Sequence, residues 1–362
     1  MVDLRFEIHP DITRASTPPS RVYTDPAVYD AFRERIFARS WQFVGDVELV
    51  RVPGQVHPLV WLAGCLDEPL LLVRDRGDRL HCISNVCTHR GNLVCEHGGV
   101  ETALRCRYHG RRFELDGSFV SMPEFEGAAN FPTKTDDLAQ VQLGQWGPFL
   151  FVALDPFVPF AEWIGPMREG MDWLPINQCR FDASRSRDYL VAANWALYVE
   201  NYLEGFHIPF VHAGLNEVLD FGSYRTDLHR FSSVQVGMGR GGDVVFGPPS
   251  SSPDYGKAIA GYYWWLFPNT MFNFYPWGVS INVVKPLGVD RTRVSFLAYV
   301  WDRSKLDLGA GSQLDRVERE DEAIVEAVQK GVRSRLYGRG RYSPTREQGT
   351  HHFHRLLAER LT

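Results

Sequence analysis

Two short segments of the sequence each place a cysteine and a histidine beside a glycine. The first reads Cys87-Thr-His89-Arg-Gly; sixteen residues separate its histidine from the second, Cys106-Arg-Tyr-His109-Gly. Two thiolates and two imidazoles can form a zinc site, or a [2Fe–2S] cluster of the Rieske type, with two cysteines on one iron and two histidines on the other. Zinc fingers usually group their cysteines and their histidines separately. One of each per segment therefore favours the cluster, with zinc as the alternative.

A second group of candidate residues lies between positions 194 and 212. The pattern predicts a helix over 194–207, and helical spacing puts three polar residues on one broad face: Asn201, Glu204 and His207. Pro209 disfavours helix for the residue before it, so the chain should leave the helix there and carry His212 on the emerging loop. Two histidines near a helix end could converge on one metal, although such a pair is more often structural.

An Fe(II) site of the 2-His-1-carboxylate type needs one further ligand. A long helix predicted over 312–336 offers three neighbouring acids. Its apolar residues form one stripe at 100° per residue: Leu314, Val317, Ile324, Val325, Val328, Val332 and Leu336. Asp321 falls in the middle of this stripe, whereas Glu320 and Glu322 fall to either side. Because a buried carboxylate is costly unless it is paired or metal-bound, Asp321 is the predicted third ligand.

The rest of the chain predicts how these groups are positioned. An N-terminal segment, 1–40, ends in a helix over 26–39 and should pack on the catalytic domain. Short β-rich runs separated by Gly, Pro and Asp predict a small all-β domain over 41–156. Residues 157–362 predict an α+β domain, an antiparallel sheet with helices on one side. Its strands are expected at these places: 244–246, 262–267, 271–274, 279–284 and 294–301.

Composition excludes several classes of function. The net charge is −5 and the pI is about 6.2, which favours neither nucleic acid nor an anionic membrane as a partner. The first twenty residues lack the apolar run of a signal peptide, and the apolar stretches are too short to span a bilayer. We therefore expect a cytoplasmic protein, in which clustered cysteines indicate metal binding rather than disulfides. The tail His351-His-Phe-His354 is expected to be a surface helix without a role.

The two Cys–His segments, followed by Phe113-Glu-Leu-Asp-Gly117, resemble the Rieske domain of ring-hydroxylating and demethylating oxygenases. The second half also matches that family, with Asn-Trp, Glu-Asn, acid-x-x-His and a further histidine. The cysteines that form a disulfide in high-potential Rieske proteins are replaced by Asn92 and Tyr108, which indicates the lower-potential oxygenase type. The chain departs from the family at Arg107 and Arg111, where Pro and Trp are common. These two departures leave the ligands unchanged. They make the prediction of the donor-binding surface and of the cluster's reduction potential less specific.

The resemblance implies an α+β chain with a small all-β Rieske domain and a helix-grip catalytic domain. It implies that His207, His212 and Asp321 hold a mononuclear Fe(II), and that Glu204 links an iron histidine to a cluster histidine of the neighbouring subunit in a homotrimer. Asn201 is included with Glu204 among the catalytic residues. Electrons for O2 should come from NAD(P)H through a separate reductase, with or without a ferredoxin. The chain itself carries no convincing dinucleotide fingerprint, because the glycines at 239–242 lie between strand-like runs.

The substrate is less closely defined than the chemistry. The aromatic segment 262–277 could be sheet core or a pocket wall that holds an aromatic ring or a quaternary ammonium group. In its modest length and in having Glu rather than Asp at 204, the chain resembles the single-subunit-type group of the family. That resemblance implies hydroxylation or N-demethylation of a small choline-, betaine- or carnitine-like substrate. The alternatives are an aromatic ring cis-dihydroxylating dioxygenase, a Rieske electron carrier without oxygenase activity, and a zinc-stabilised ligand-binding protein.

Overall fold

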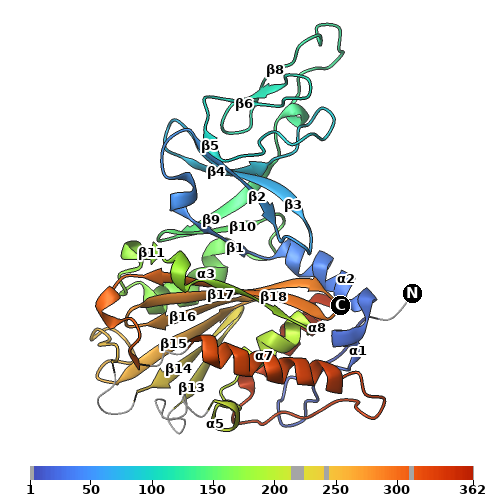
Figure 1. Cartoon of the computed structure of the whole chain (residues 1–362). Helices are drawn as coiled ribbons and strands as arrows, with labels where there is room; N and C mark the ends of the chain where they lie inside the picture. The colour runs from blue at the N-terminus through green and yellow to red at the C-terminus, as the bar shows by residue number, and fades with distance from the viewer. Residues whose placement is uncertain (1–3, 213–223, 240–243, 310–313, 362) are drawn as a thin grey trace. The chain divides into compact units, whose positions relative to one another are not determined.

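The computed structural model describes residues 4–212, 224–239, 244–309 and 314–361 (Figure 1). The chain forms two compact units. The smaller unit is Trp41–Phe157, and the larger unit combines Met1–Ser40 with Val158–Thr362. Part of the predicted glycine-rich loop, residues 240–242, lies outside the described residues, as do 312 and 313 of the predicted long helix.

The smaller unit is built from β-strands. Its seven-stranded antiparallel sheet has the order β1-β10-β9-β4-β3-β2-β5, with these bounds: β1 Gln42–Asp46, β2 Gln55–Trp61, β3 Glu68–Arg74, β4 Leu80–Ser84, β5 Gly99–Val100, β9 Gln140–Trp146 and β10 Phe149–Ala153. A three-stranded sheet follows the order β6-β7-β8: β6 Leu104–Arg105, β7 Arg112–Phe113 and β8 Phe119–Ser121. Short 3-10 helices occur at Val47–Val50 and Lys134–Asp136.

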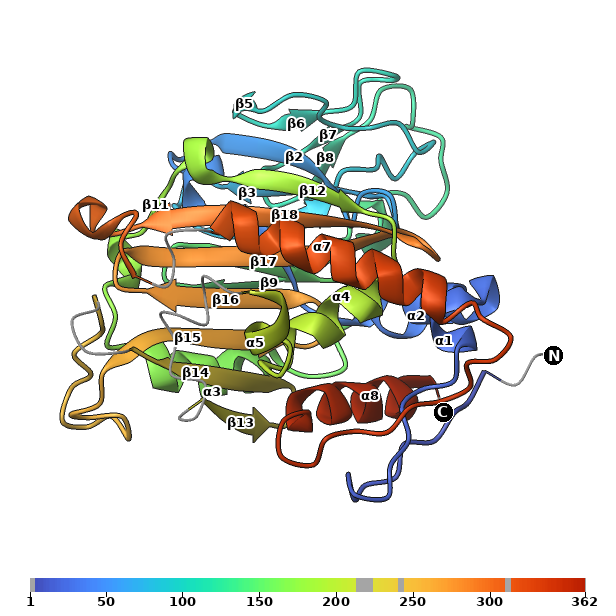
Figure 2. The ribbon, with the colours of Figure 1, turned by 60° about the horizontal axis from the view of Figure 1, so that its bottom comes forward.

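The larger unit is organised by an antiparallel sheet of eight strands (Figure 2). Its order is β11-β18-β17-β16-β15-β14-β13, and β12 also pairs with β18. The bounds are β11 Arg180–Phe181, β12 Arg187–Val191, β13 Arg225–His229, β14 Ser232–Met238, β15 Ile259–Leu266, β16 Thr270–Tyr275, β17 Gly278–Gly288 and β18 Arg291–Val300. All six positions of β16 are buried. Both faces of this strand are therefore covered, and its buried positions include the polar residues Thr270 and Asn273.

Helices complete the larger unit, and α7 crosses the face of the sheet beside α4 (Figure 2). The helix α3 packs against β14 and β15, and α8 packs against β13 and α2. The bounds are α1 Arg21–Thr24, α2 Pro26–Arg35, α3 Phe160–Met171, α4 Trp195–Tyr202, α5 Ile208–Val211, α7 Leu314–Gly331 and α8 Gln348–Leu361. Further 3-10 helices are Phe37–Arg39, Ile176–Gln178, Ala183–Arg185 and Arg303–Lys305. The α+β class predicted from the sequence is confirmed.

Some predicted elements differ from the structure. The helix predicted over 194–207 ends at Tyr202, and a second helix begins at Ile208. Pro209 lies in the first turn of α5, where its missing N–H is tolerated, so it did not exclude helix at the preceding residue. Residues 244–246 form no strand; only an isolated bridge joins Phe246 to Ile259.

The C-terminal histidines are also placed differently from the prediction of a surface helix. His354 is fully buried in α8, where its Nδ1 lies 2.6 Å from the Tyr342 hydroxyl and its Nε2 lies 2.9 Å from Glu200 Oε1. His351 is 6% exposed, and its Nε2 lies 2.8 Å from the carbonyl of His9. This helix is therefore part of the core of the larger unit.

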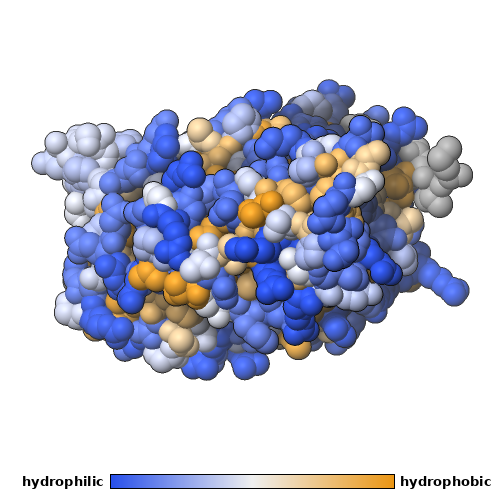
Figure 3. Space-filling model, turned by 90° about the horizontal axis from the view of Figure 1, so that it is seen from above, coloured by the Kyte–Doolittle hydropathy of each residue, from blue (hydrophilic) through white to orange (hydrophobic). Residues whose placement is uncertain are grey.

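Among the described residues, no helix combines the length and the apolar character needed to cross a bilayer. The face seen in Figure 3 carries its hydrophobic residues in groups that are broken up by hydrophilic ones.

Candidate functional site

The two Cys–His loops of the smaller unit are built in the same way. Gly91 N donates to Cys87 O, and Gly110 N donates to Cys106 O, both at 3.0 Å. The φ angles of Gly91 and Gly110 are +72° and +77°, in the left-handed region that glycine adopts without steric cost. The glycine in each motif therefore closes a tight turn that presents the preceding cysteine and histidine.

These loops meet at their tips. The rings of His89 and His109 pack edge to face with centroids 4.7 Å apart, and Cys87 and Cys106 are each 2% exposed. The two cysteines are adjacent free thiols rather than a disulfide. Burial raises the pKa of the Cys87 thiol, and the adjacent thiol of Cys106 also raises it, against a lowering by the N–H of His89. The Nδ1 atom of His109 is buried without a hydrogen-bond partner among the described residues.

Two buried thiols and an orphaned imidazole nitrogen are donors that a bound metal group would complete. The donor types fit a [2Fe–2S] cluster of the Rieske kind. Next to this set, Asn92 Nδ2 lies 3.6 Å from Cys106 Sγ and could donate to a cluster sulfur. The predicted ligands Cys87, His89, Cys106 and His109 are thus brought together.

The two positions that depart from the family pattern differ in environment. Arg107 is on the surface, with 74% of its side chain exposed. Arg111 is 2% exposed, pairs with Asp136 and lies over the Phe119 ring at 4.9 Å. Arg111 is therefore an interior cation of the smaller unit and not part of a surface that could meet an electron donor.

The second site begins where α4 ends. Asn194 caps α4 by accepting a hydrogen bond from Ala196 N, and its own N–H donates to Gln329 Oε1 on α7 at 2.7 Å. This contact fixes the start of α4 against α7. As a result, Asn201 near the end of α4 donates through Nδ2 to Asp321 Oδ1 on α7 at 2.7 Å.

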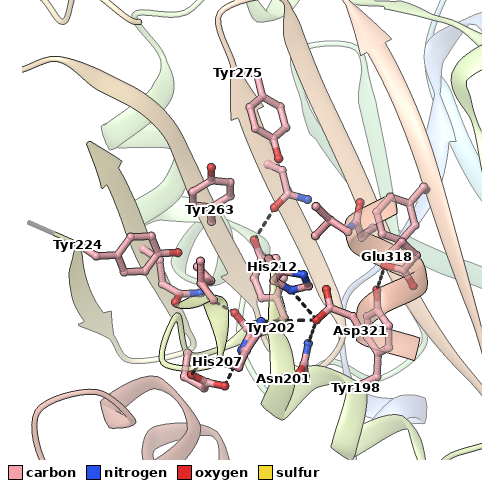
Figure 4. Close-up of a pocket in the computed structure, with 17 residues that line it drawn as sticks. Tyr198, Asn201, Tyr202, His207, His212, Tyr224, Tyr263, Tyr275, Glu318 and Asp321 are labelled. Atoms are coloured by element: carbon pink, nitrogen blue, oxygen red, sulfur yellow. Dashed lines mark hydrogen bonds and ion pairs between the residues drawn. The ribbon is translucent and has the colours of Figure 1, made fainter. Parts of the chain in front are cut away.

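Three side chains converge here: His207 and His212 flank the short helix α5, and Asp321 lies on α7 (Figure 4). The potential ligand atoms of His207, His212 and Asp321 all lie within 4.8 Å of one another. His212 Nε2 lies 3.0 Å from Asp321 Oδ1, and His207 Nε2 lies 3.5 Å from the same oxygen. Two imidazoles and one carboxylate form the 2-His-1-carboxylate donor set that suits non-haem Fe(II) and leaves open coordination positions.

A carboxylate holds the outer nitrogen of each histidine. His207 Nδ1 lies 2.7 Å from Glu204 Oε1, and His212 Nδ1 lies 2.8 Å from Glu320 Oε2. With Nδ1 protonated towards these acids, each imidazole directs its Nε2 lone pair at the space beside Asp321. Burial lowers the pKa of His212, but Asp321 and Glu320 outweigh burial and raise it. The site is therefore an acidic environment that favours a cation.

Glu204 and His207 do not lie within the helix that the sequence predicted. They occupy the turn between α4 and α5, where the Glu204 carboxylate accepts hydrogen bonds from the N–H groups of Phe206 and His207. The tight turn, rather than a shared helix face, holds the acid against the histidine.

The triad opens into a cavity of about 120 Å³. Five tyrosines line it: Tyr198, Tyr202, Tyr224, Tyr263 and Tyr275. Burial raises the pKa of each of these phenols, so they keep their O–H groups at neutral pH. Tyr263 and Tyr275 belong to the aromatic segment 262–277, whereas its neighbours Trp264 and Trp265 are buried in the sheet core. Some residues of the segment therefore line the cavity, and others belong to the sheet core.

The inward face of α7 differs from the predicted apolar stripe. Ile324 and Val328 are 40% and 41% exposed, and Leu336 lies beyond the helix and is 98% exposed. Three positions of α7 are among the buried residues: Glu318, Val325 and Gln329, of which Glu318 and Gln329 are polar. Val332, just after the helix, is also buried. Asp321 remains half-buried, so its carboxylate reaches the site although the stripe was placed wrongly.

Sequence reasoning missed two acids of this site. Glu320 holds the Nδ1 atom of His212. It could have been predicted, because it is next to Asp321 in the sequence and a metal-binding imidazole usually needs a hydrogen-bond partner for its other nitrogen. Glu318 lines the cavity, and the Tyr198 hydroxyl donates to its Oε2 at 2.6 Å. Burial raises the pKa of Glu318 to about 8 against the opposing hydrogen bond from Tyr198. No sequence pattern pointed to it.

Known protein families match both halves of the chain. The Rieske [2Fe-2S] domain matches residues 40–132, and the ring hydroxylating alpha subunit (catalytic domain) matches residues 172–362. Choline monooxygenase of Arabidopsis thaliana is 32% identical over 97% of this chain and 84% of the relative's length. The carnitine monooxygenase oxygenase subunit of Escherichia coli K12 is 30% identical over 95% of this chain and 94% of its own length.

Solved structures share the whole fold. A quaternary ammonium Rieske monooxygenase in complex with L-carnitine has a TM-score of 0.75 at 22% identity, covering 99% of this chain and 100% of that one. Naphthalene 1,2-dioxygenase from Rhodococcus has a TM-score of 0.72 at 18% identity, covering 95% and 93%. The two domain families and the relatives that are at least 30% identical confirm the resemblance predicted from the sequence. With both domain families in succession and relatives alike over nearly its full length, the chain belongs to the Rieske non-haem iron oxygenases, as an oxygenase component that uses a [2Fe–2S] cluster and a mononuclear iron.

Proposed function

We propose that this oxygenase inserts one atom of O2 into a C–H bond close to the nitrogen of a small quaternary ammonium compound. The observation that carries this proposal is the composition of the cavity. Tyrosine rings and carboxylates surround the triad, and none of the described lining residues is lysine or arginine. Aromatic faces and carboxylates are the groups that attract a quaternary ammonium ion. The names of the plant and bacterial relatives, which refer to choline and carnitine, support the same substrate class.

In this proposal, His207, His212 and Asp321 hold the iron, and Glu204, Glu320 and Asn201 orient those three ligands. The iron supplies the reductive activation of O2 in its open coordination positions. The protein's own contribution is to hold the three ligand side chains in position and to bind the substrate next to them. The second carboxylate oxygen of Glu204 is tied to backbone N–H groups, so the support of His207 is rigid.

Rieske oxygenases take their electrons from a separate reductase. We propose that Cys87, His89, Cys106 and His109 hold the cluster that receives them, with or without an intervening ferredoxin. We also propose the homotrimer, with Glu204 linking His207 to a cluster histidine of the next subunit. Sedimentation of the holoenzyme at three times the chain mass of 41.3 kDa would support the trimer, and a monomer would contradict it. The cytoplasmic location stays a prediction.

Aromatic ring cis-dihydroxylation is the second candidate, because the tyrosine wall could also stack on an aromatic ring. The polar side chains of Gln235, Asn273 and Asn282 in the same cavity weigh against an apolar ring.

The test is a substrate screen of the reconstituted, iron-loaded protein with a reductase under O2. Choline, L-carnitine and glycine betaine are compared with aromatic acids, and mass spectrometry scores a product with one added oxygen, or the aldehyde that it releases, against cis-diols. Amine-dependent O2 consumption with such products supports the proposal. Diols alone, or no amine-dependent consumption, would refute it.

A further inference from the structure

The buried acid Glu318 belongs to the cavity but is not used by the iron site. Its side chain is 3% exposed, and one carboxylate oxygen, Oε2, accepts from the Tyr198 hydroxyl at 2.6 Å. The other oxygen, Oε1, is buried and has no hydrogen-bond partner in the described part of the chain. A buried carboxylate oxygen without a partner is costly in free energy. Its presence in a cavity wall indicates a group that a ligand completes.

The position of Glu318 suits contact with a substrate bound at the iron. Glu318 precedes Asp321 by three residues on α7, which is a rise of about 4.5 Å along the helix, and both residues line the cavity. Figure 4 shows Glu318 and Tyr198 to one side of Asp321, with Tyr224 and Tyr263 on the opposite side. A small molecule between these walls would meet the tyrosine rings and Glu318 together.

The charges around the cavity define what Glu318 can recognise. Among the residues that the structure describes, three acids line it: Glu204, Glu318 and Asp321. Glu204 is occupied by His207, and Asp321 is occupied by the histidines and by Asn201. Of these three acids, Glu318 is the one left to face a ligand. No lysine or arginine among the described lining residues could pair with a carboxylate on the substrate. A ligand carboxylate would therefore lie near like charges without a counter-ion.

We propose that Glu318 is a specificity-determining residue that selects substrates with a net positive charge and disfavours those that also carry a carboxylate. This inference rests on the proposed function and narrows it to choline-like rather than carnitine- or betaine-like substrates. Burial raises the pKa of Glu318, but a cation bound beside it favours the ionised carboxylate, so the two charges balance each other. A hydroxyl on the substrate can donate to Oε1. A zwitterionic substrate carries the same cation but also an anion, and no lysine or arginine among the described lining residues could act as its counter-ion.

The experiment measures equilibrium binding to the iron-loaded oxygenase by calorimetry, without reductase, so that no turnover occurs. The probes are choline, its uncharged isostere 3,3-dimethyl-1-butanol, glycine betaine and L-carnitine. The wild type is expected to bind choline about tenfold or more tightly than each of the other three. Glu318→Gln keeps the volume and an acceptor for Tyr198 but removes the charge. It should weaken choline binding by about 10- to 100-fold, the range for a hydrogen bond to a charged group, and leave the isostere within about threefold.

Glu322→Gln is the matched control, because it removes an acid from the same helix, also with a partly buried side chain, that does not line the cavity. It should bind all four probes as the wild type does. Iron content and the melting temperature establish that both variants are folded and loaded.

Two results would overturn the inference: wild-type affinities for glycine betaine or L-carnitine equal to that for choline, or an unchanged preference in Glu318→Gln. If an amine is still oxygenated in the reconstituted system, this inference alone has failed. If the wild type neither binds nor oxidises any quaternary amine, the proposed function has failed with it.

Discussion

Glu320 makes a direct test of how the iron site is built, because it touches His212 and not the space where substrate binds. We predict that Glu320→Ala weakens Fe(II) binding while leaving the Rieske cluster unchanged. His212 is 1% exposed, and its Nδ1 has the Glu320 carboxylate as a partner at 2.8 Å. Without that acceptor, the buried ring loses the contact that fixes its tautomer and its direction.

The magnitude follows from the kind of bond that is lost. A hydrogen bond to a charged group contributes about 1.5–3 kcal/mol, and about 1.4 kcal/mol corresponds to a factor of ten in an equilibrium constant. Glu320 is 28% exposed, so solvent screening reduces its contribution towards the lower end. We therefore expect Fe(II) affinity to fall by about tenfold in Glu320→Ala, within the range known for outer ligand partners. Glu320→Gln, which retains an acceptor oxygen, should lose less.

The assay is competition for Fe(II) against a chelator of known affinity under anaerobic conditions. The absorbance and EPR signal of the cluster in the same sample serve as an internal reference for folded protein. Glu322→Ala, on the same helix but outside the site, is the control. Unchanged iron affinity in Glu320→Ala would refute the view that this carboxylate positions His212.

Three further predictions concern other groups. Asp321→Ala should retain the cluster spectrum but lose turnover, and normal turnover would exclude Asp321 as an iron ligand. Arg111→Met should lower the cluster reduction potential in an EPR-monitored titration, because it removes a buried cation next to a cluster loop, whereas Arg111→Lys should not. Burial raises the pKa of Asp75, but hydrogen bonds from His81 and Arg79 outweigh burial and hold it below its ordinary value. Asp75 therefore contributes its full stabilisation above a pH of about 4 and loses it progressively as the pH falls below that, so Asp75→Asn should lower the denaturant midpoint of cluster absorbance at pH 7 by more than at a pH of about 3.

The ligand residues could be proposed from the sequence because donor types and local spacing carry the information. A Cys-x-His or Cys-x-x-His pair followed by glycine defines a loop by itself. His207 and His212 are close enough in sequence to meet without knowledge of the wider fold. The same reasoning chose Asp321 from an apolar stripe that the structure corrects, since Ile324 and Val328 face solvent.

What the sequence could not provide depends on packing between distant elements. Glu318 and Tyr198 are 120 residues apart, and Glu320 and His212 are 108 residues apart. The packing of α7 beside α4, which includes the hydrogen bond from Asn194 N to Gln329 Oε1, brings the two members of each pair together. Helical periodicity places an acid on a face of its own helix but does not say which partner that face will meet.

The smaller unit is inserted between two segments of the larger one, and this arrangement has a consequence for biosynthesis. Arg339 donates to the carbonyls of Thr17, Glu7 and Ser16, which precede it by 322 to 332 residues. The nascent chain cannot make these contacts until residue 339 has been translated. The smaller unit can form its own sheet while the chain is still on the ribosome. The first forty residues reach their final contacts only after the C-terminal elements have been synthesised. Early exposure of that segment to proteases and chaperones is thus a property of the chain order itself.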